Sequence, residues 1–250
     1  MNSYTDLIKI IHEDDELLIV DKPAGITVNK SETTVNEITV QDWAEHKLKI
    51  NSEMSDENSE SDFYNRGGIV HRLDKETSGI LLIAKSESAF INLQKQFKER
   101  TIKKTYVSLA HGKISPDKGE INVPVGRLPW NRKQFGIIPG GRESRTDYKV
   151  LQHIYISKLK EYLSLVELYP QSGRTHQIRV HLKYIGHPIF SDFLYAGRKT
   201  SRKDRKVLPR VFLHAAGISF LHPKNQKNVS FSSGLPSELT DAVEHLQDNS

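Results

Sequence analysis

One carboxylate in this chain has neighbours that would let it react. Asp74 lies in the string His71-Arg72-Leu73-Asp74-Lys75-Glu76-Thr77-Ser78-Gly79, two positions after an arginine and just before a Thr-Ser-Gly turn. Apolar residues flank the string on both sides, at 69–70 and 80–84. An acid at the mouth of buried structure, beside a cation, can stay ionised and act as a base or a nucleophile. Structural ion pairs use the same residue types, so the string alone also fits a structural role.

A second dense polar string lies far along the chain. It reads Gly173-Arg174-Thr175-His176-Gln177-Ile178-Arg179-Val180-His181 and is also embedded in apolar sequence. Two such strings suggest a shared pocket. Burial drives an aspartic acid towards its neutral form, and an adjacent guanidinium reverses that shift.

Other kinds of site have weaker support. The chain has no cysteine, which excludes disulfides, thiolate catalysis and cysteine metal ligands. Its histidines lack a tight ligand spacing such as HExxH, so we predict no metal site and expect the imidazoles to brace the motif backbones through hydrogen bonds. The glycine pairs Gly67-Gly68 and Gly140-Gly141 are not nucleotide-cradling loops, so no cofactor is predicted. The histidines considered are His71, His176, His181, His187 and His214.

Composition fits a globular protein with a polyanionic partner. The 250 residues are 36% hydrophobic and 27% charged, which suits a globular protein of one large domain or two small ones. We expect a single catalytic domain over 1–250 with a core at about 7–247. No apolar run is long enough to span a membrane, and no secretory signal begins the chain, so we expect a cytoplasmic protein. The net charge is +5, and it is +10 without the acidic segment 51–62. We interpret 51–65 as an acidic surface loop. The basic remainder suits a polyanionic partner, and it equally suits a soluble basic surface without one.

The elements that must position the two strings are mostly short strands. Apolar runs at 7–11, 17–20 and 105–110 predict strands, and 147–151 and 162–168 predict an antiparallel pair. Helices are predicted at 35–50, 86–100, 176–184 and 236–246, the second of them capped by Ser86. The basic run 198–210 reads as a loop. This mixture predicts an α+β fold with a mixed, mainly antiparallel sheet flanked by helices and loops, and a central active-site cleft.

With both strings in view, the chain resembles the RluA family of RNA pseudouridine synthases. The match runs from about Ile10 to Pro223 and consists of four motifs in the expected order, each of moderate weight alone. The motifs are Glu13 to Gly25, His71 to Gly79, Lys104-Thr105-Tyr106, and Ser172 to His181 with its continuation Ile185-Gly186-His187-Pro188-Ile189 and Asp192.

The resemblance implies a reaction and roles for particular residues. That family isomerises uridine to pseudouridine within RNA without a cofactor, and the resemblance makes Asp74 the essential acid. It also implies that a basic residue of the fourth motif pairs with Asp74: we assign Arg179, with Arg174 as the other candidate. Tyr106 matches the aromatic residue that stacks on the flipped uracil. Arg72 matches the residue that helps to hold the extruded nucleotide, and we expect Leu168 at the pocket wall.

The remaining expectations concern RNA binding. Only about nine residues precede the first motif, so we expect no N-terminal accessory RNA-binding domain. Because the sequence shows no evident exposed apolar helix, we expect a monomer. Phosphate contacts would then come from the catalytic domain, through 98–104, 127–145 and 198–210. One alternative is a non-catalytic RNA-binding or RNA-folding module on the same scaffold. Another is a glycosidic hydrolase, although no second carboxylate accompanies Asp74. Ribosomal RNA and transfer RNA both remain open as substrates.

Overall fold

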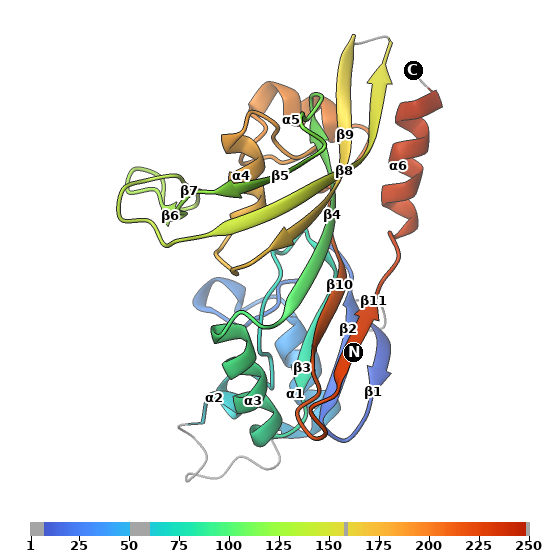
Figure 1. Cartoon of the computed structure of the whole chain (residues 1–250). Coiled ribbons are helices and arrows are strands. Elements are labelled where there is room, and N and C mark those ends of the chain that lie inside the picture. Colours follow the sequence, from blue (N-terminus) through green and yellow to red (C-terminus); the bar gives the residue numbers. More distant parts are fainter. Residues whose placement is uncertain (1–7, 51–60, 158–159, 249–250) are drawn as a thin grey trace. The chain divides into compact units, whose positions relative to one another are not determined.

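The computed structural model describes residues 8–50, 61–157 and 160–248, and these form two compact units (Figure 1). Unit 1 comprises Met1–Ile102 and Gly217–Ser233, and unit 2 comprises Lys103–Ala216 and Gly234–Ser250. Each unit combines antiparallel strands with helices and has its own cluster of buried apolar side chains. The predicted α+β fold is therefore confirmed, whereas the expectation of a single catalytic domain stays a prediction.

Unit 1 is built on an antiparallel sheet whose third strand leads out of the Asp74 string. Strand β1 (Lys9–Glu13) pairs with β2 (Leu17–Lys22), and β2 pairs with β3 (Ser78–Ala84). Every residue of β3 is buried, which explains why this strand reads as a continuous apolar run. The end of β10 (Leu213–Leu221) forms a hairpin with β11 (Asn228–Ser232). The predicted strands at 7–11 and 17–20 are thus close to β1 and β2.

The helices of unit 1 are partly as predicted. Helix α3 (Glu87–Lys98) buries Ala89, Phe90 and Leu93, and the Ser86 hydroxyl accepts a hydrogen bond from the Ala89 amide, as expected for its cap. Helix α1 (Val40–Leu48) is shorter than predicted because Thr39 and Asp42 cap it later in the chain, after a 3-10 turn η2 (Glu32–Thr34). The prediction of an acidic surface loop over 51–65 is wrong for residues 62–65.

Only the end of the predicted acidic loop can be compared with the structure, because residues 51–60 lie outside the described residues. Residues Asp62–Asn65 form the short helix α2. Phe63 is buried there, and its ring meets that of Phe90 edge-on at 5.9 Å. This single apolar side chain belongs to the core cluster of unit 1, so the segment after residue 61 is not a surface loop.

Unit 2 contains a four-stranded antiparallel sheet in the order β4-β9-β8-β5. Its strands are β4 (Lys103–His111), β9 (Glu161–Pro170), β8 (Arg145–Ile156) and β5 (Lys118–Asn122). The predicted pair at 147–151 and 162–168 is confirmed, and both strands are longer, with a register shift between Val150 and Gln152. The short hairpin β6 (Gly126–Arg127) and β7 (Phe135–Gly136) occupies the segment rich in Gly and Pro.

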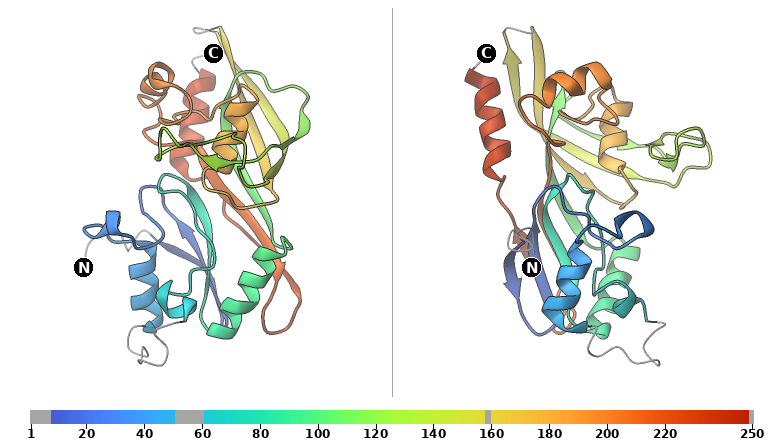
Figure 2. Two further views of the ribbon diagram at one scale, coloured as in Figure 1. Left: turned by 90° about the vertical axis from the view of Figure 1, so that its left-hand side faces the viewer. Right: turned by 180° about the vertical axis from the view of Figure 1, so that it is seen from behind.

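Three helices accompany this sheet. Helix α4 (Gln177–Tyr184) and helix α6 (Ser237–Asp248) lie on opposite faces of it (Figures 1 and 2), and both contribute side chains to the core cluster of unit 2. Residues Arg198–Asp204 form helix α5, so the expectation of a loop over 198–210 is wrong for these residues. None of the helices within the described residues is both long and apolar enough to cross a bilayer.

Candidate active site

Asp74 lies in a turn of unit 1, four residues before β3, and its side chain is half-buried. The backbone around it is closely held. The Asp74 carbonyl accepts a hydrogen bond from the Thr77 amide at 3.0 Å, and the Lys75 carbonyl accepts one from the Gly25 amide at 2.7 Å. The Gly25 turn therefore supports the turn that carries the acid.

A buried lysine joins these two turns. Lys22, at the end of β2, has no exposed surface, and its ammonium group donates hydrogen bonds to the carbonyls of Pro23, Ile26 and Lys75 at 2.8, 2.9 and 3.2 Å. A buried ammonium needs such acceptors because its desolvation is otherwise costly. Sequence reasoning missed this residue. Its available signal was a lysine two residues after the apolar run 17–20.

Close backbone contact fixes the segment that precedes the Asp74 string. Gly68 has φ +73°, and a Cβ atom there would lie 2.2 Å from the Ala84 carbonyl oxygen, so only glycine fits. Three residues later, the Nε2 atom of His71 accepts a hydrogen bond from the Leu82 amide of β3 at 2.9 Å. The His71 ring also packs on Phe97 at 5.0 Å. His71 thus braces a motif backbone, as predicted.

Arg72 is exposed, between half-buried His71 and buried Leu73. An exposed guanidinium next to the acid turn can contact a phosphate or a nucleotide. Its predicted role in holding an extruded nucleotide stays a prediction.

Arg179 is held in unit 2 by a carboxylate of the same motif region. It lies on α4 with 7% of its surface exposed, and its Nε and one terminal nitrogen donate to the two oxygens of Asp192 at 2.7 and 2.9 Å. Asp192 is fully buried, and the guanidinium also lies over the Tyr195 ring at 5.0 Å. This two-pronged contact uses two of the five N–H donors and fixes the plane of the guanidinium.

A buried glutamine organises the turn that precedes α4. The Gln177 side-chain oxygen accepts hydrogen bonds from the Ser172 hydroxyl at 2.7 Å and the Arg174 amide at 3.1 Å. Its nitrogen donates to the Arg145 carbonyl and the Thr146 hydroxyl, each at 3.0 Å. The half-buried Arg174 side chain bonds the Glu143 carbonyl at 3.3 Å. Arg174 and Arg179 therefore have different settings, one at the rim of a loop and one buried.

Tyr106 and Leu168 are brought together by the sheet of unit 2. They are direct partners in the antiparallel pairing of β4 with β9, with Tyr106 half-buried and Leu168 fully buried. Two residues before Tyr106, Lys104 donates a hydrogen bond to the Ser172 carbonyl at 3.0 Å, which ties β4 to the turn before α4. Burial lowers the pKa of Lys104 to about 8. Lys104 lies in the segment 98–104 for which phosphate contacts were predicted, and that role stays a prediction.

Histidine bonding in unit 2 is structural. His181 is fully buried, with Nδ1 2.9 Å from the Thr146 hydroxyl and Nε2 3.1 Å from the Ser144 hydroxyl. Burial lowers the pKa of this imidazole. Nδ1 of His176 bonds the Tyr195 hydroxyl at 2.8 Å. Among the residues that the structure describes, no group of three or more His, Cys, Asp or Glu side chains is placed to hold a metal ion.

The predicted site residues therefore fall into two sets. Asp74 and Arg72 belong to unit 1, and Tyr106, Leu168, Arg174 and Arg179 belong to unit 2. Within unit 2 the structure pairs Tyr106 with Leu168 and orders both arginines around the start of α4. The contact between Asp74 and Arg179 stays a prediction.

Comparisons with known proteins agree with this arrangement of motifs. The family model described as RNA pseudouridylate synthase matches residues 16–184, which include Asp74, Tyr106 and Arg179. The chain is 36% identical over 244 residues to the ribosomal large subunit pseudouridine synthase D of Nitrosomonas europaea, covering 96% of this chain and 65% of that protein. It is 34% identical over 245 residues to the RNA pseudouridine synthase YlyB of Bacillus subtilis, covering 97% and 74%.

Solved structures give the same result for the fold. The human RNA pseudouridylate synthase domain containing 1 superposes with a TM-score of 0.71 at 25% identity, over 98% of this chain and 97% of that one. The human domain containing 4 has a TM-score of 0.70 at 20% identity, over 95% and 92%. Fold and motifs together define the class of RNA-modifying isomerases. The chain belongs to the RNA pseudouridylate synthase family, and within it to the RluA type, as the sequence motifs predicted.

Proposed function

We propose that this protein converts uridine to pseudouridine in structured RNA, without a cofactor, and that Asp74 is the essential carboxylate. The observation that carries the proposal is the family match over 16–184 together with the acid turn that it contains. In this reaction the bond from uracil N1 to ribose C1′ breaks, C5 bonds to C1′, the C5 proton is lost and N1 gains a proton. Asp74 either attacks C1′ or removes the 2′ proton, and both routes require the ionised form.

The other motif residues have roles that fit their settings. Arg179, oriented by Asp192, pairs with Asp74 and favours its ionised form. Tyr106, supported by Leu168 on the neighbouring strand, stacks on the extruded uracil. Exposed Arg72 holds the extruded nucleotide or the space that it leaves, and Arg174 contacts RNA at the rim of its loop. These side chains would act together on one flipped uridine.

The substrate is ribosomal RNA, transfer RNA or both. The Nitrosomonas relative is named for the large ribosomal subunit, which makes ribosomal RNA the first substrate to test. A cysteine-free chain with a net charge of +5 suits a cytoplasmic protein that binds RNA as a monomer.

The test is to incubate the purified protein with transcribed ribosomal and transfer RNA and to measure pseudouridine and free uracil by mass spectrometry. Pseudouridine without free uracil supports the proposal. Free uracil would identify a hydrolase, and RNA binding without either product would identify a non-catalytic module. Pseudouridine mapping of total RNA from cells with and without the gene then identifies the modified uridines.

A further inference from the structure

A pocket in unit 2 contains none of the motif residues discussed above. Its cavity volume is about 160 Å³, smaller than that of a drug-sized ligand site and suited to one small group such as a single base. It is lined by His111, Ile156, Glu161, Leu163, Phe190, Lys199, Thr200, Lys203, Asp204, Val207 and Leu246.

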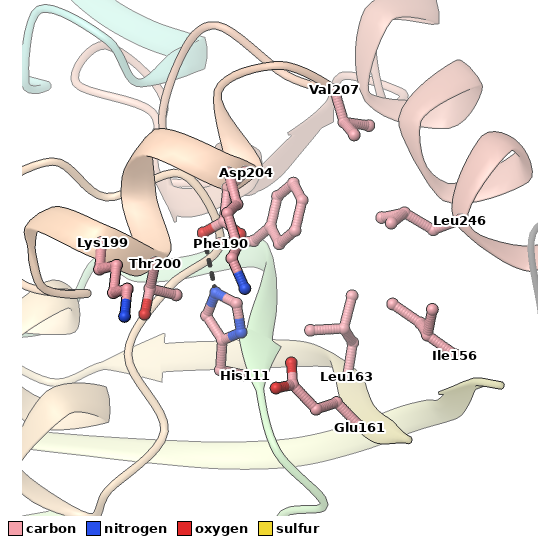
Figure 3. A pocket seen from close by; sticks show the side chains of 11 residues that line it. His111, Ile156, Glu161, Leu163, Phe190, Lys199, Thr200, Asp204, Val207 and Leu246 are labelled. Carbon is pink, nitrogen blue, oxygen red and sulfur yellow. Dashed lines mark hydrogen bonds and ion pairs between the residues drawn. The ribbon is translucent and has the colours of Figure 1, made fainter. Parts of the chain in front are cut away.

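The pocket has a cationic side and an apolar side. Figure 3 shows Lys199 and Thr200 on one side and Val207, Leu246 and Ile156 on the other, with His111 between them. Leu163, Phe190, Ile156 and Leu246 are each at least nine-tenths buried, so they form a fixed apolar wall. A ligand with an anionic group at one end and a flat, largely apolar body fits this division.

The polar centre of the pocket is held in place, because the buried carboxylate of Asp204 makes a hydrogen bond with His111. Asp204 is 6% exposed, and one of its oxygens accepts hydrogen bonds from the Ser191 amide at 3.1 Å and from Nε2 of His111 at 2.9 Å. The His111 ring also packs on Phe190 at 5.6 Å. Nδ1 of His111 has no partner among the described residues. With Nε2–H donating to Asp204, Nδ1 can accept a hydrogen bond.

Glu161 adds a second acceptor to the lining (Figure 3). Carboxylates and imidazole acceptors bind amino groups of bases, as in the pairing of Glu with the cytosine amino group. Uracil has no amino group. The pocket therefore favours a base that carries one, and its lining is not that expected for the reacting uridine.

The surface beside the pocket favours an RNA strand as the source of the ligand. Helix α5 carries Lys199 and Lys203 of the pocket, and Arg198 and Arg202 are exposed on the same helix. Lysines and arginines on one helix attract the phosphates of a polynucleotide.

We propose that this pocket binds one nucleotide of the bound RNA, turned out of its stack, whose phosphate contacts Lys199 and Lys203 and whose amino-bearing base lies against Phe190 and the aliphatic wall. The proposal rests on RNA being the substrate and adds a recognition site apart from the one for the reacting uridine. Such a site would select RNA by the position of one unstacked base.

The test compares RNA affinities of the full-length protein and three variants. Lys199→Ala and Arg202→Ala each remove one exposed cation from α5, but only Lys199 lines the pocket. Val207→Phe fills the pocket without changing charge, and Val207 is half-buried, so the added volume faces the cavity. With a ribosomal RNA fragment that the wild type modifies, we expect Lys199→Ala and Val207→Phe to weaken binding about five- to a hundredfold, the range for a lost base contact. Arg202→Ala should weaken it by a smaller factor.

Competition with free nucleotides tests the base preference. GMP or CMP should displace the RNA fragment from wild type at lower concentration than UMP, and this difference should vanish in Val207→Phe. If Lys199→Ala and Arg202→Ala lost RNA affinity equally and Val207→Phe bound RNA as the wild type does, the proposal that the pocket binds RNA would be wrong. Equal competition by UMP would overturn the preference for an amino-bearing base.

The outcome is separable from that of the proposed function. Conversion of uridine at saturating RNA should be unchanged in Val207→Phe, because the pocket holds none of the proposed catalytic groups. A protein that binds RNA through the pocket but makes no pseudouridine would refute the proposed function and retain the pocket.

Discussion

The two motif regions are held in place in different ways. The Asp74 turn of unit 1 is fixed through its backbone, by Lys22 on three carbonyls and by the close passage of Gly68 past Ala84. The start of α4 in unit 2 is fixed through side chains, by Arg179 on Asp192 and by Gln177. Backbone support leaves the Asp74 side chain half-buried, which a reactive acid requires. Side-chain support suits Arg179, because its proposed role requires the guanidinium to be held in one orientation.

The largest effect on stability should come from breaking the buried pair of unit 2. Asp192→Ala leaves the Arg179 guanidinium buried without its carboxylate, and such changes cost about 3–5 kcal/mol. Urea denaturation measures the loss. The matched control is Asp147→Ala, which removes a half-buried aspartate from the exposed Arg145 at 2.9 Å and should cost less than about 1 kcal/mol. Similar losses in the two variants would contradict the role assigned to the buried pair.

Glycine replacement tests the backbone support of unit 1. Gly68→Ala should cost more than the roughly 1–3 kcal/mol of a left-handed residue, since the added Cβ would also collide with the Ala84 carbonyl. Gly25→Ala is the control, because it has φ +91° with nothing within 4 Å of the added atom. Thermal unfolding of both variants should rank Gly68→Ala as the less stable. If Gly25→Ala were the less stable variant, the close approach of Gly68 to the Ala84 carbonyl would not be what fixes the segment before Asp74.

Lys22→Met separates support of the acid turn from general stability. It removes the donor to the Pro23, Ile26 and Lys75 carbonyls while keeping most of the side-chain volume, and buried acceptors left without donors cost about 1–3 kcal/mol. Because the Lys75 carbonyl follows Asp74 directly, we expect slower isomerisation at saturating RNA even where the variant is fully folded. A folded variant with wild-type turnover would show that Lys22 only stabilises the core.

The smallest effect should be a pH dependence from His181. Burial lowers its pKa in the folded state, so below about pH 6.5 the unfolded chain takes up a proton that the buried ring does not. The stability that neutral His181 contributes is therefore present above that pH and is lost as the pH falls through the folded pKa. Urea titrations should show the advantage of wild type over His181→Asn shrinking between pH 7.5 and 5. A constant advantage would contradict this assignment.

The helices and strands that bury apolar side chains could be predicted from the sequence. Helix α3 was found from its stripe of Ala89, Phe90 and Leu93 and its Ser86 cap, and β8 and β9 from apolar runs. Helix α5 was missed because the residues it buries, Ser201 and Asp204, are polar, so no hydrophobic period marks it. Helix α2 was missed because its aromatic residues, Phe63 and Tyr64, are adjacent and show no helical period at the end of an acidic stretch.

The same reason explains what was missed near the candidate site. Lys22, Gln177 and Asp192 are buried polar residues, and their partners are backbone carbonyls or side chains distant in sequence. No spacing rule connects such partners, so only coordinates reveal them. All three also lie in the quoted motifs, so a motif position alone did not assign their roles. The roles of Asp74, Tyr106 and Arg179 could be predicted because the resemblance to the family implies them.

The central claim is that the Asp74 carboxylate performs the isomerisation. Its most direct test is the release of tritium from RNA labelled at C5 of uridine, measured in a single turnover with wild type and Asp74→Asn. Since the amide keeps the shape of the side chain but cannot supply a carboxylate, the account predicts no release by Asp74→Asn, with folding and RNA affinity retained. Release by Asp74→Asn at the wild-type rate would contradict it.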